Sequence, residues 1–370
     1  MKGLILSGGH GTRLRPLTYT RAKQLIPLAN KPVLFYAIEA LQNAGIHDIG
    51  IIVGDTHAEI ESAVHMHNWA PETAITFIPQ DAPLGLAHAV KIAQPFIGAE
   101  KFVMFLGDNL IGESLLPMAQ DFARDTCPAN CRILLKEVPN PSQFGVAVID
   151  PVSQESSPRV VQLIEKPKNP PSNLALVGIY FFSKDIFTAV NAIQPSARGE
   201  LEITDAIQWL LTNGKTIEAQ KLTGYWIDTG KMEDILDANR QVLKDLSPAI
   251  SPDIFIDSNS TLIGDVSIQS GARIEQSVIR GPAIIGEHTT IRNSYIGPYT
   301  SIYHHARFDS CEIEYSIALE YTVVSSIPYR IEESLIGRYA EIYPSSGKPQ
   351  GLKLMLGDHS RTGIPDFSKL

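Results

Sequence analysis

A periodic spacing of apolar residues in the last third of the chain most constrains its fold. Aliphatic or aromatic side chains recur there in steps of six, six and five residues, so the pattern returns every 17 residues. Neither an α-helix, with a period of 3.6 residues, nor a single strand, with a period of two, produces this spacing. A triangular coil with one inward residue on each face does, and its turns stack into a left-handed parallel β-helix. The predicted inward residues are Leu262, Ile268, Ile274, Ile279, Ile285, Ile291, Ile296, Ile302, Phe308, Ile313 and Leu319.

Glycine follows several of the inward positions of the predicted coil, as is typical of hexapeptide repeats. It does so at Ile285-Gly286, Ile296-Gly297 and Ile336-Gly337, whereas other turns carry Gln269, Glu275 or Arg280. The repeat is therefore degenerate, and an irregular β-sandwich is the alternative interpretation. We expect the coil to occupy residues 250–345, followed by a non-periodic tail over 346–370 that packs on it.

The first 245 residues instead alternate strand and helix patterns. Helical spacing covers residues 32–44 and 86–96, and short apolar or β-branched runs occur at 2–7, 48–53, 75–79 and 102–106. Short continuous apolar runs separated by helices indicate a buried parallel sheet, so we expect a Rossmann-like, doubly wound α/β domain over residues 1–245. Ligands of such domains bind beyond the carboxyl ends of the strands, where residues 8–13 and 107–109 fall.

Composition excludes several classes of function. The 370-residue chain has a formal net charge of -9 and a pI of about 5.6, and therefore lacks the basic footprint of proteins that bind nucleic acid or anionic membranes. No apolar run approaches the roughly 20 residues that cross a bilayer, and no signal peptide precedes the first strand. Cys127, Cys131 and Cys311 are poorly spaced for zinc. We expect reduced structural thiols in a cytoplasmic protein.

A glycine-rich turn follows the first predicted strand. The chain reads Leu6-Ser7-Gly8-Gly9-His10-Gly11-Thr12-Arg13, and Lys23 follows ten residues later. Glycines let backbone N–H groups converge on an anion. Arg13 can donate two parallel hydrogen bonds to a phosphate, and Lys23 adds a compact positive charge. The turn lacks the Gly-Lys-Ser/Thr ending of a Walker A loop and is not Gly-x-Gly-x-x-Gly, which disfavours a dinucleotide dehydrogenase. It predicts a phosphate-binding loop.

This segment resembles the signature of the sugar-1-phosphate nucleotidyltransferases, and the similarity extends through about the first 240 residues. Its further blocks are Leu106-Gly107-Asp108-Asn109, Glu165-Lys166-Pro167, Arg198 to Asp205 and Trp226 to Gly230. The last three are similar to glucose-1-phosphate thymidylyltransferases. Together with the predicted coil, the whole chain resembles the long form of that family.

The resemblance implies a set of site residues. Asp108 and Asp228 would bind Mg²⁺, which takes one or two protein carboxylates and fills its other positions with water and phosphate oxygens. Arg13, Lys23, Lys166 and Arg198 would be the catalytic cations, the last two acting on the phosphate of the sugar. The residues implied to hold the nucleotide are Leu6, Gly8, Gly9, Gly11, Thr12, Gln24, Gln80 and Gly85, and those implied to hold the sugar are Asn109, Gly145 and Glu165.

The implied reaction is a single in-line displacement that joins dTTP and glucose 1-phosphate to give dTDP-glucose and pyrophosphate. The attacking phosphate is already an anion, so neither a covalent intermediate nor a general base is required. Gln80 could pair with a pyrimidine edge. Because thymine and uracil differ there only by a methyl group, worth about 1–3 kcal/mol, UTP is a possible slower substrate. Phe144 stands where short-form relatives commonly have tyrosine, so a hydroxyl contact is lost.

Three alternatives remain open on the sequence. The enzyme could prefer UTP or another nucleotide. It could be bifunctional, with acyltransferase activity in the coil and His304-His305 as a base. It could instead be a non-catalytic subunit, although such a protein is expected to lose residues such as Arg13 or Asp108, which stand here. We expect a homo-oligomer, with the number of subunits left open.

Overall fold

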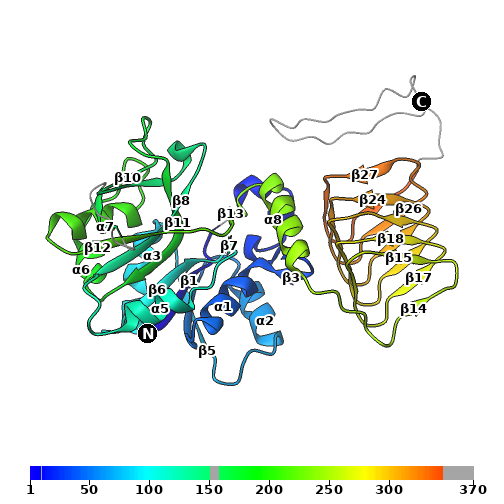
Figure 1. The fold of residues 1–370 in the computed structure, drawn as a ribbon, viewed down its shortest axis with the longest axis horizontal. Coiled ribbons are helices and arrows are strands. Elements are labelled where there is room, and N and C mark those ends of the chain that lie inside the picture. The colour runs from blue at the N-terminus through cyan, green and yellow to red at the C-terminus, as the bar shows by residue number, and fades with distance from the viewer. Residues whose placement is uncertain (10, 151–157, 345–370) are drawn as a thin grey trace.

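The computed structural model describes residues 1–9, 11–150 and 158–344. Figure 1 shows an N-terminal α/β lobe and a C-terminal coil, with helix α8 (Met232–Asp245) between them. The predicted tail over 346–370 lies outside the described residues.

A nine-stranded mixed sheet forms the centre of the α/β lobe. Its first part is parallel: β1 pairs with β4 on one side and β6 on the other, and β4 pairs with β5. These four strands confirm the predicted parallel sheet. The other strands join through β11, which runs antiparallel to β6, β8 and β9. The strands are β1 (Lys2–Leu6), β4 (Asp48–Val53), β5 (Ala74–Pro79), β6 (Phe102–Leu106), β8 (Cys131–Glu137), β9 (Gly145–Ile149), β10 (Val160–Glu165), β11 (Leu174–Phe182) and β12 (Ile217–Lys221).

Helices cover both faces of the sheet because successive strand side chains point to opposite faces. In β1, Ile5 packs in one buried cluster with α1 (Val33–Asn43), α2 (His57–Met66) and α5 (Leu116–Ala123). Leu4 and Leu6 pack in the other cluster with helices α3 (Leu86–Ile92), α4 (Gln94–Ile97), α6 (Ile186–Ala192) and α7 (Ile203–Thr212). The helix predicted over 86–96 is therefore two helices. The second begins at Gln94 with Pro95 in its first turn, where proline is tolerated because the first N–H groups of a helix have no partner within it.

The C-terminal coil is a left-handed parallel β-helix with three sheets, which confirms the predicted fold. Each strand pairs in parallel with the strand one turn later, as in Ile279↔Ile296 and Ile285↔Ile302. The first sheet contains β14 (Phe255–Ile256), β17 (Arg273–Glu275), β20 (Thr290–Arg292), β23 (Arg307–Asp309), β26 (Val323–Ser325) and β29 (Glu341–Ile342). The second contains β15 (Thr261–Ile263), β18 (Val278–Arg280), β21 (Tyr295–Ile296), β24 (Glu312–Glu314) and β27 (Arg330–Glu332). The third contains β16 (Val266–Ile268), β19 (Ala283–Ile285), β22 (Thr300–Ile302), β25 (Ile317–Ala318) and β28 (Leu335–Ile336).

The prediction that Leu319 points into the coil is wrong. Ile302 pairs with Ala318 and not with Leu319, so this turn is one residue shorter than the repeat, and Ala318 takes the inward position. Leu319 is buried outside the coil, in a cluster that includes Leu14 and Ile26 of the α/β lobe. The shortened turn thus provides an apolar contact between the two parts of the chain.

A buried asparagine on α8 also links the lobe to the coil. Asn239 Oδ1 accepts hydrogen bonds from the Ala29 backbone N–H at 2.8 Å and from Ser301 Oγ at 2.7 Å. Its Nδ2 donates to the Tyr299 carbonyl at 3.2 Å. Its side chain is therefore bonded to both parts of the chain. Ala29 lies between the short strands β2 (Pro27–Leu28) and β3 (Lys31–Pro32).

Candidate functional site

The site begins where the parallel strands β1 and β6 end side by side. The Gly107 N–H donates to the Leu6 carbonyl at 2.9 Å, and the Ser7 N–H donates to the Ile52 carbonyl at 2.9 Å. A Cβ atom at Gly107 would lie 3.1 Å from the Leu6 oxygen, so the absence of a side chain permits this approach. The glycine-rich turn and residues 107–109 consequently share one edge of the sheet, as the sequence predicted.

A two-stranded ribbon brings the two predicted metal ligands together. Strand β7 (Asn109–Ile111) runs antiparallel to β13 (Trp226–Asp228), with Asn109 opposite Asp228. Both the backbone N–H and the hydroxyl of Thr229 donate to the Asp108 carbonyl, at 3.0 and 2.7 Å. Asp108 and Asp228, 120 residues apart in the sequence, therefore lie at neighbouring positions.

Two of the predicted cations lie beside these carboxylates. The ammonium group of Lys23, which is buried, donates a short hydrogen bond to Asp108 Oδ2. Arg13 is exposed, and its guanidinium lies against the backbone after Asp228: a Cβ at Gly230 would meet Arg13 Nη2 at 2.8 Å. Gly230 thus leaves room for the arginine at the edge of the aspartate pair.

The electrostatics of the aspartate pair favour a bound cation. Burial, and then the nearby carboxylate of Asp108, raise the pKa of Asp228 to about 6, although Lys23 and Arg13 act in the opposite direction. A buried carboxylate whose pKa is raised by a neighbouring carboxylate is suited to a divalent ion, because the cation offsets the repulsion between the two negative charges. Within the described ranges, no group of three or more His, Cys, Asp or Glu side chains could hold a metal. Two carboxylates match the number that Mg²⁺ takes when phosphates complete its coordination.

The glycine-rich turn lies against two buried or partly buried amide side chains. A Cβ at Gly8 would meet Gln80 Oε1 at 2.9 Å, and one at Gly9 would lie 3.9 Å from Gln24 Nε2. Gly11 has φ of 61°, in the left-handed region where glycine is favoured, and precedes the 3₁₀ turn Thr12–Leu14. Ser7 Oγ and Gln24 Oε1 are buried without a hydrogen-bond partner among the described residues. Unsatisfied buried polar atoms are costly, so their presence beside this turn fits a ligand contact.

The predicted base-reading segment is anchored at both ends. Gln80 Nε2 lies 3.0 Å from His88 Nδ1, so a neutral His88 can accept its hydrogen bond. Burial, and then the charge of Lys91, lower the pKa of His88 and favour that neutral form. At the other end, Gly85 has φ of 105°, and a Cβ there would lie 2.4 Å from the Leu201 oxygen.

The predicted sugar and sugar-phosphate residues, apart from Asn109, which lies beside Asp108, form one cluster. Glu165 Oε1 accepts from Arg198 Nη2 at 3.1 Å, and Thr204 Oγ1 donates to Glu165 Oε2 at 2.7 Å. Lys166 lies near the same carboxylate, with Nζ 3.7 Å from Oε1. A Cβ at Gly145 would lie 2.9 Å from Thr204 Oγ1 and 3.0 Å from Glu165 Oε2. Because Gly145 has no side chain, Thr204 and Glu165 can lie close to its backbone.

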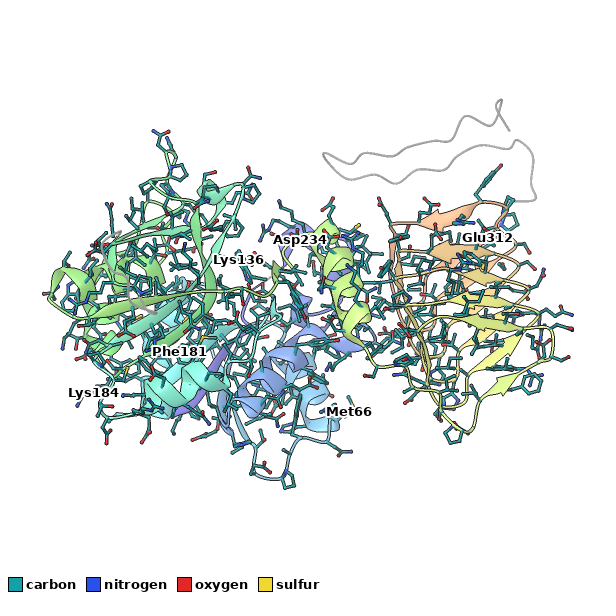
Figure 2. All side chains as sticks on the ribbon, viewed as in Figure 1. Met66, Lys136, Phe181, Lys184, Asp234 and Glu312 are labelled. Atoms are coloured by element: carbon teal, nitrogen blue, oxygen red, sulfur yellow. The ribbon has the colours of Figure 1, made fainter. Side chains whose placement is uncertain are left out.

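A cleft of about 910 Å³ joins the sugar cluster to the aspartate pair. Figure 2 labels Lys136 on β8 and Asp234 on α8, which both line this cleft. Predicted residues in the lining are Arg13, Asn109, Gly145, Glu165, Lys166, Arg198 and Asp228. Among the described residues, Lys23, Asp108 and the predicted nucleotide contacts are not part of that lining. Lys23 and Asp108 adjoin it through Asp228, and the nucleotide contacts gather around the glycine-rich turn.

Sequence reasoning missed several residues that organise this site. Trp226 Nε1 donates to Asn109 Oδ1 at 2.6 Å, and Asn109 Nδ2 donates to Asp108 Oδ1 at 2.9 Å. Thr204 holds Glu165, and Trp226 holds Asn109. Both lie within the blocks that carried the family resemblance, which was the available signal. His88 lies in none of these blocks, and its contact with Gln80 depends on where α3 packs in the folded chain.

The histidines of the coil form a local pair away from this cleft. The Nδ1 atoms of His304 and His305 lie 3.0 Å apart, and burial lowers the pKa of His304. The His305 ring stacks on Tyr321 and is tilted against His288, with ring centroids 5.1 and 5.0 Å away. The acyltransferase alternative stays a prediction. The three cysteines are free thiols, and two of them, Cys131 and Cys311, are buried.

Comparison with known proteins shows which family the chain resembles along its length. The sequence pattern of the nucleotidyl transferase family matches residues 2–245. The chain is 49% identical to a glucose-1-phosphate thymidylyltransferase of Streptomyces antibioticus and 46% identical to one of Streptomyces griseus, over 98% of this chain and 99% of each relative. A crystal structure of a putative glucose-1-phosphate thymidylyltransferase from Bacillus anthracis, in complex with a sucrose, superposes with a TM-score of 0.59 at 32% identity. It covers 67% of this chain and 97% of that one.

No helix in the described part of the chain is long and apolar enough to span a bilayer. The family pattern covers the lobe that carries the aspartate pair and the glycine-rich turn, and the two relatives match along nearly the full length, coil included. The chain belongs to the nucleotidyl transferase family.

Proposed function

We propose that this enzyme transfers a thymidylyl group from dTTP to α-D-glucose 1-phosphate, giving dTDP-glucose and pyrophosphate. One observation carries the proposal. Asp228 and Arg13 line the same cleft as the cluster of Glu165, Lys166 and Arg198, and Asp108 with its partner Lys23 adjoins that cleft beside Asp228. That arrangement supplies charge for a nucleotide at one end and hydroxyl and phosphate recognition for a sugar at the other. The substrates are those named for the two Streptomyces relatives.

Asp108 and Asp228 are the residues that would hold Mg²⁺. Their adjacent carboxylates and the raised pKa of Asp228 fit a divalent ion. Such an ion supplies positive charge that neutralises phosphate oxygens and aligns the reacting groups. The ammonium group of Lys23 contacts Asp108 and so holds that carboxylate in place.

The protein's own groups account for positioning. Lys166 and Arg198 would orient the phosphate of the sugar so that one of its oxygens attacks the α-phosphorus. As that bond forms, the bond from the α-phosphorus to the leaving oxygen breaks, and Arg13 and Lys23 stabilise the negative charge on the pyrophosphate. Glu165, held by Thr204, would accept hydrogen bonds from sugar hydroxyls, and Gly145 leaves the space for the sugar.

The nucleotide would bind over the glycine-rich turn, with its phosphates near Gly8, Gly9, Gly11 and Thr12. Gln80 and Gly85 are proposed to read the base, and the unpartnered Gln24 Oε1 is available for a further contact. A glutamine amide recognises the edge that thymine and uracil share. Preference for dTTP therefore depends on the space around the thymine methyl group, which limits the discrimination to about 1–3 kcal/mol.

The test is release of pyrophosphate with glucose 1-phosphate and Mg²⁺, measured in parallel with dTTP, UTP, ATP, CTP and GTP. We expect dTTP to give the highest kcat/KM. Asp108→Asn should lower kcat at least about 100-fold, because a metal ligand and the partner of Lys23 are lost. Asp125→Asn, at an exposed turn after α5, is the matched control and should keep full activity.

Equal or better turnover with UTP would overturn the thymidylyl preference and keep the chemistry. Release from none of the five nucleotides, over a set of sugar 1-phosphates, would overturn the proposed function.

We also propose a homo-oligomer in the cytoplasm. Sedimentation analysis and cell fractionation test these two points.

A further inference from the structure

The coil contacts the segment of the α/β lobe that joins Arg13 to Lys23. Residues 17–21 connect the turn that carries Arg13 to Lys23. Arg21 Nη1 donates to Glu320 Oε2 of the coil at 2.9 Å, across 299 positions of sequence. One turn further along, Arg338 Nη2 donates to the Thr20 carbonyl. A Cβ at Gly337 would lie 3.2 Å from Leu17 Cδ2, so the coil backbone comes close to this segment.

The ion pair between Arg21 and Glu320 is largely removed from water. The exposed fractions of the two side chains are 13% and 10%. Arg21 Nε is buried without a hydrogen-bond partner among the described residues. A buried charge that loses its partner is strongly unfavourable, so Glu320 fixes where the arginine can lie. Among the described side chains, Glu320 is the carboxylate that holds this guanidinium.

Arg21 is coupled in turn to the catalytic cations. It stands two residues before Lys23, and the Ala22 N–H between them is held by Glu59 Oε2 at 2.7 Å. On its other side, Thr18 Oγ1 donates to the Gly11 carbonyl at 2.7 Å, next to the turn of Thr12 and Arg13. Leu14 and Leu17 pack in the same apolar cluster as Leu319 and Ile317 of the coil. A shift of the segment would therefore move the groups that meet the nucleotide.

We propose that Glu320 is a positioning residue for nucleotide binding, and that through Arg21 the β-helix holds the phosphate-binding loop in its working conformation. The inference rests on the proposed function for the identity of the nucleotide. The sugar cluster of Glu165, Lys166 and Arg198 has its ion-pair partners within the α/β lobe, and no described side chain of the coil is bonded to it. Loss of the pair should thus act on the nucleotide and spare the sugar phosphate.

The test compares the full-length wild-type chain with Glu320→Gln, which removes the charge and keeps the shape. We expect the KM for dTTP to rise roughly tenfold while the KM for glucose 1-phosphate changes less than about twofold. The matched control is Glu314→Gln. Glu314 is also a coil glutamate bound to an arginine, but its partner is Arg330 of the coil itself, at 3.2 Å. Both Michaelis constants of this control should stay at wild-type values.

A double variant separates positioning from the cost of an unpaired charge. In Arg21→Gln/Glu320→Gln no charge is left buried, yet the link to the coil is lost, so the raised KM for dTTP should persist. Return of that KM to the wild-type value would overturn the proposal. So would an equal rise of both Michaelis constants, or no change in Glu320→Gln. If Glu320→Gln fails to fold, Glu320→Asp carries the test and should raise the KM for dTTP alone.

Calorimetry keeps this inference distinct from the proposed function. Binding of dTTP to the unreacted enzyme needs no turnover, and its Kd should rise in Glu320→Gln by about the same factor as the KM. A wild-type preference for UTP would overturn the substrate assignment, and the same comparison would then be made with UTP. Equal nucleotide affinity in wild type and Glu320→Gln would overturn the positioning role whatever the preferred nucleotide.

Discussion

Trp226 donates its indole N–H to Asn109 Oδ1 at 2.6 Å, and Asn109 in turn donates to the Asp108 carboxylate. Both ends of the Asn109 amide are therefore occupied within the site. Asn109 was implied to contact the sugar, and it does line the cleft. Asn109 also orients Asp108, a predicted metal ligand, and Trp226 in turn orients Asn109.

The tryptophan support predicts a change in metal affinity. Trp226 packs edge-on against Phe144 at 5.2 Å, and Trp226→Phe leaves an aromatic ring at this position but removes the N–H. Groups that orient metal ligands contribute about 10–100-fold to metal affinity. We expect the Mg²⁺ concentration for half-maximal pyrophosphate release to rise roughly tenfold. Trp69→Phe, which removes an indole bond to the Val64 carbonyl on α2, is the control. An unchanged Mg²⁺ requirement in Trp226→Phe would contradict the prediction.

Gly145 predicts a selective effect on the sugar. In Gly145→Ala the new methyl group would meet Thr204 Oγ1 and Glu165 Oε2 at about 3 Å, so the carboxylate must move. Because a displaced binding group costs affinity steeply, the KM for glucose 1-phosphate should rise on the order of tenfold. The KM for dTTP should stay within twofold of wild type. Initial rates with each substrate varied in turn measure both, and a rise confined to the nucleotide would refute the assignment of Gly145.

His88 predicts an acid limb in nucleotide binding. Its pKa is lowered from the ordinary value of 6.5, first by burial and then by Lys91, so the ring is neutral at pH 7 and accepts from Gln80. As pH falls, His88 is protonated in the unfolded chain before it is protonated in the folded one. The contribution of His88 to the free energy of unfolding is therefore complete above pH 6.5 and is lost as pH falls through the lower pKa of the folded state. The KM for dTTP should rise several-fold over that same acid window, because protonated Nδ1 cannot accept.

The pH profile of a substituted enzyme checks the role of His88. His88→Asn should raise the KM for dTTP at pH 7 and flatten its dependence on pH below 6.5. The control is His65→Asn, since His65 is exposed on α2 and packs edge-on against Phe77. An acid limb that persists unchanged in His88→Asn would assign it to another group.

Asn239 predicts a loss of stability at the junction of lobe and coil. In Asn239→Ala the Ala29 N–H and Ser301 hydroxyl lose a buried acceptor, which should lower the free energy of unfolding by about 3 kcal/mol. Denaturant titration measures this. Asn191→Ala, in which an exposed residue loses its hydrogen bond to the Phe187 carbonyl within α6, should cost less than about 1 kcal/mol. Equal losses in the two variants would show that the junction is not stabilised by Asn239.

The repeating patterns were predictable because they are local. The run from Ile279 to Phe308 repeats its spacing regardless of what lies beside it. The buried strands ending at Leu6 and Leu106 were predictable from their continuous apolar residues. The glycine-rich turn likewise follows from its own residues. The register slip at Ala318 was not predictable from the period, because it depends on Leu319 packing against Leu14 of the other lobe.

The sequence alone therefore determined the two architectures, the edge of the sheet that bears the phosphate-binding loop, and the types of residue available to the site. Only the tertiary structure decided which side chains meet. Asp108 and Asp228 become neighbours because β7 pairs with β13, and Arg21 reaches Glu320 because the coil docks on the lobe. Periodicity reports the burial of one segment, whereas a contact between distant residues depends on how whole elements pack, and packing is a property of the assembled chain.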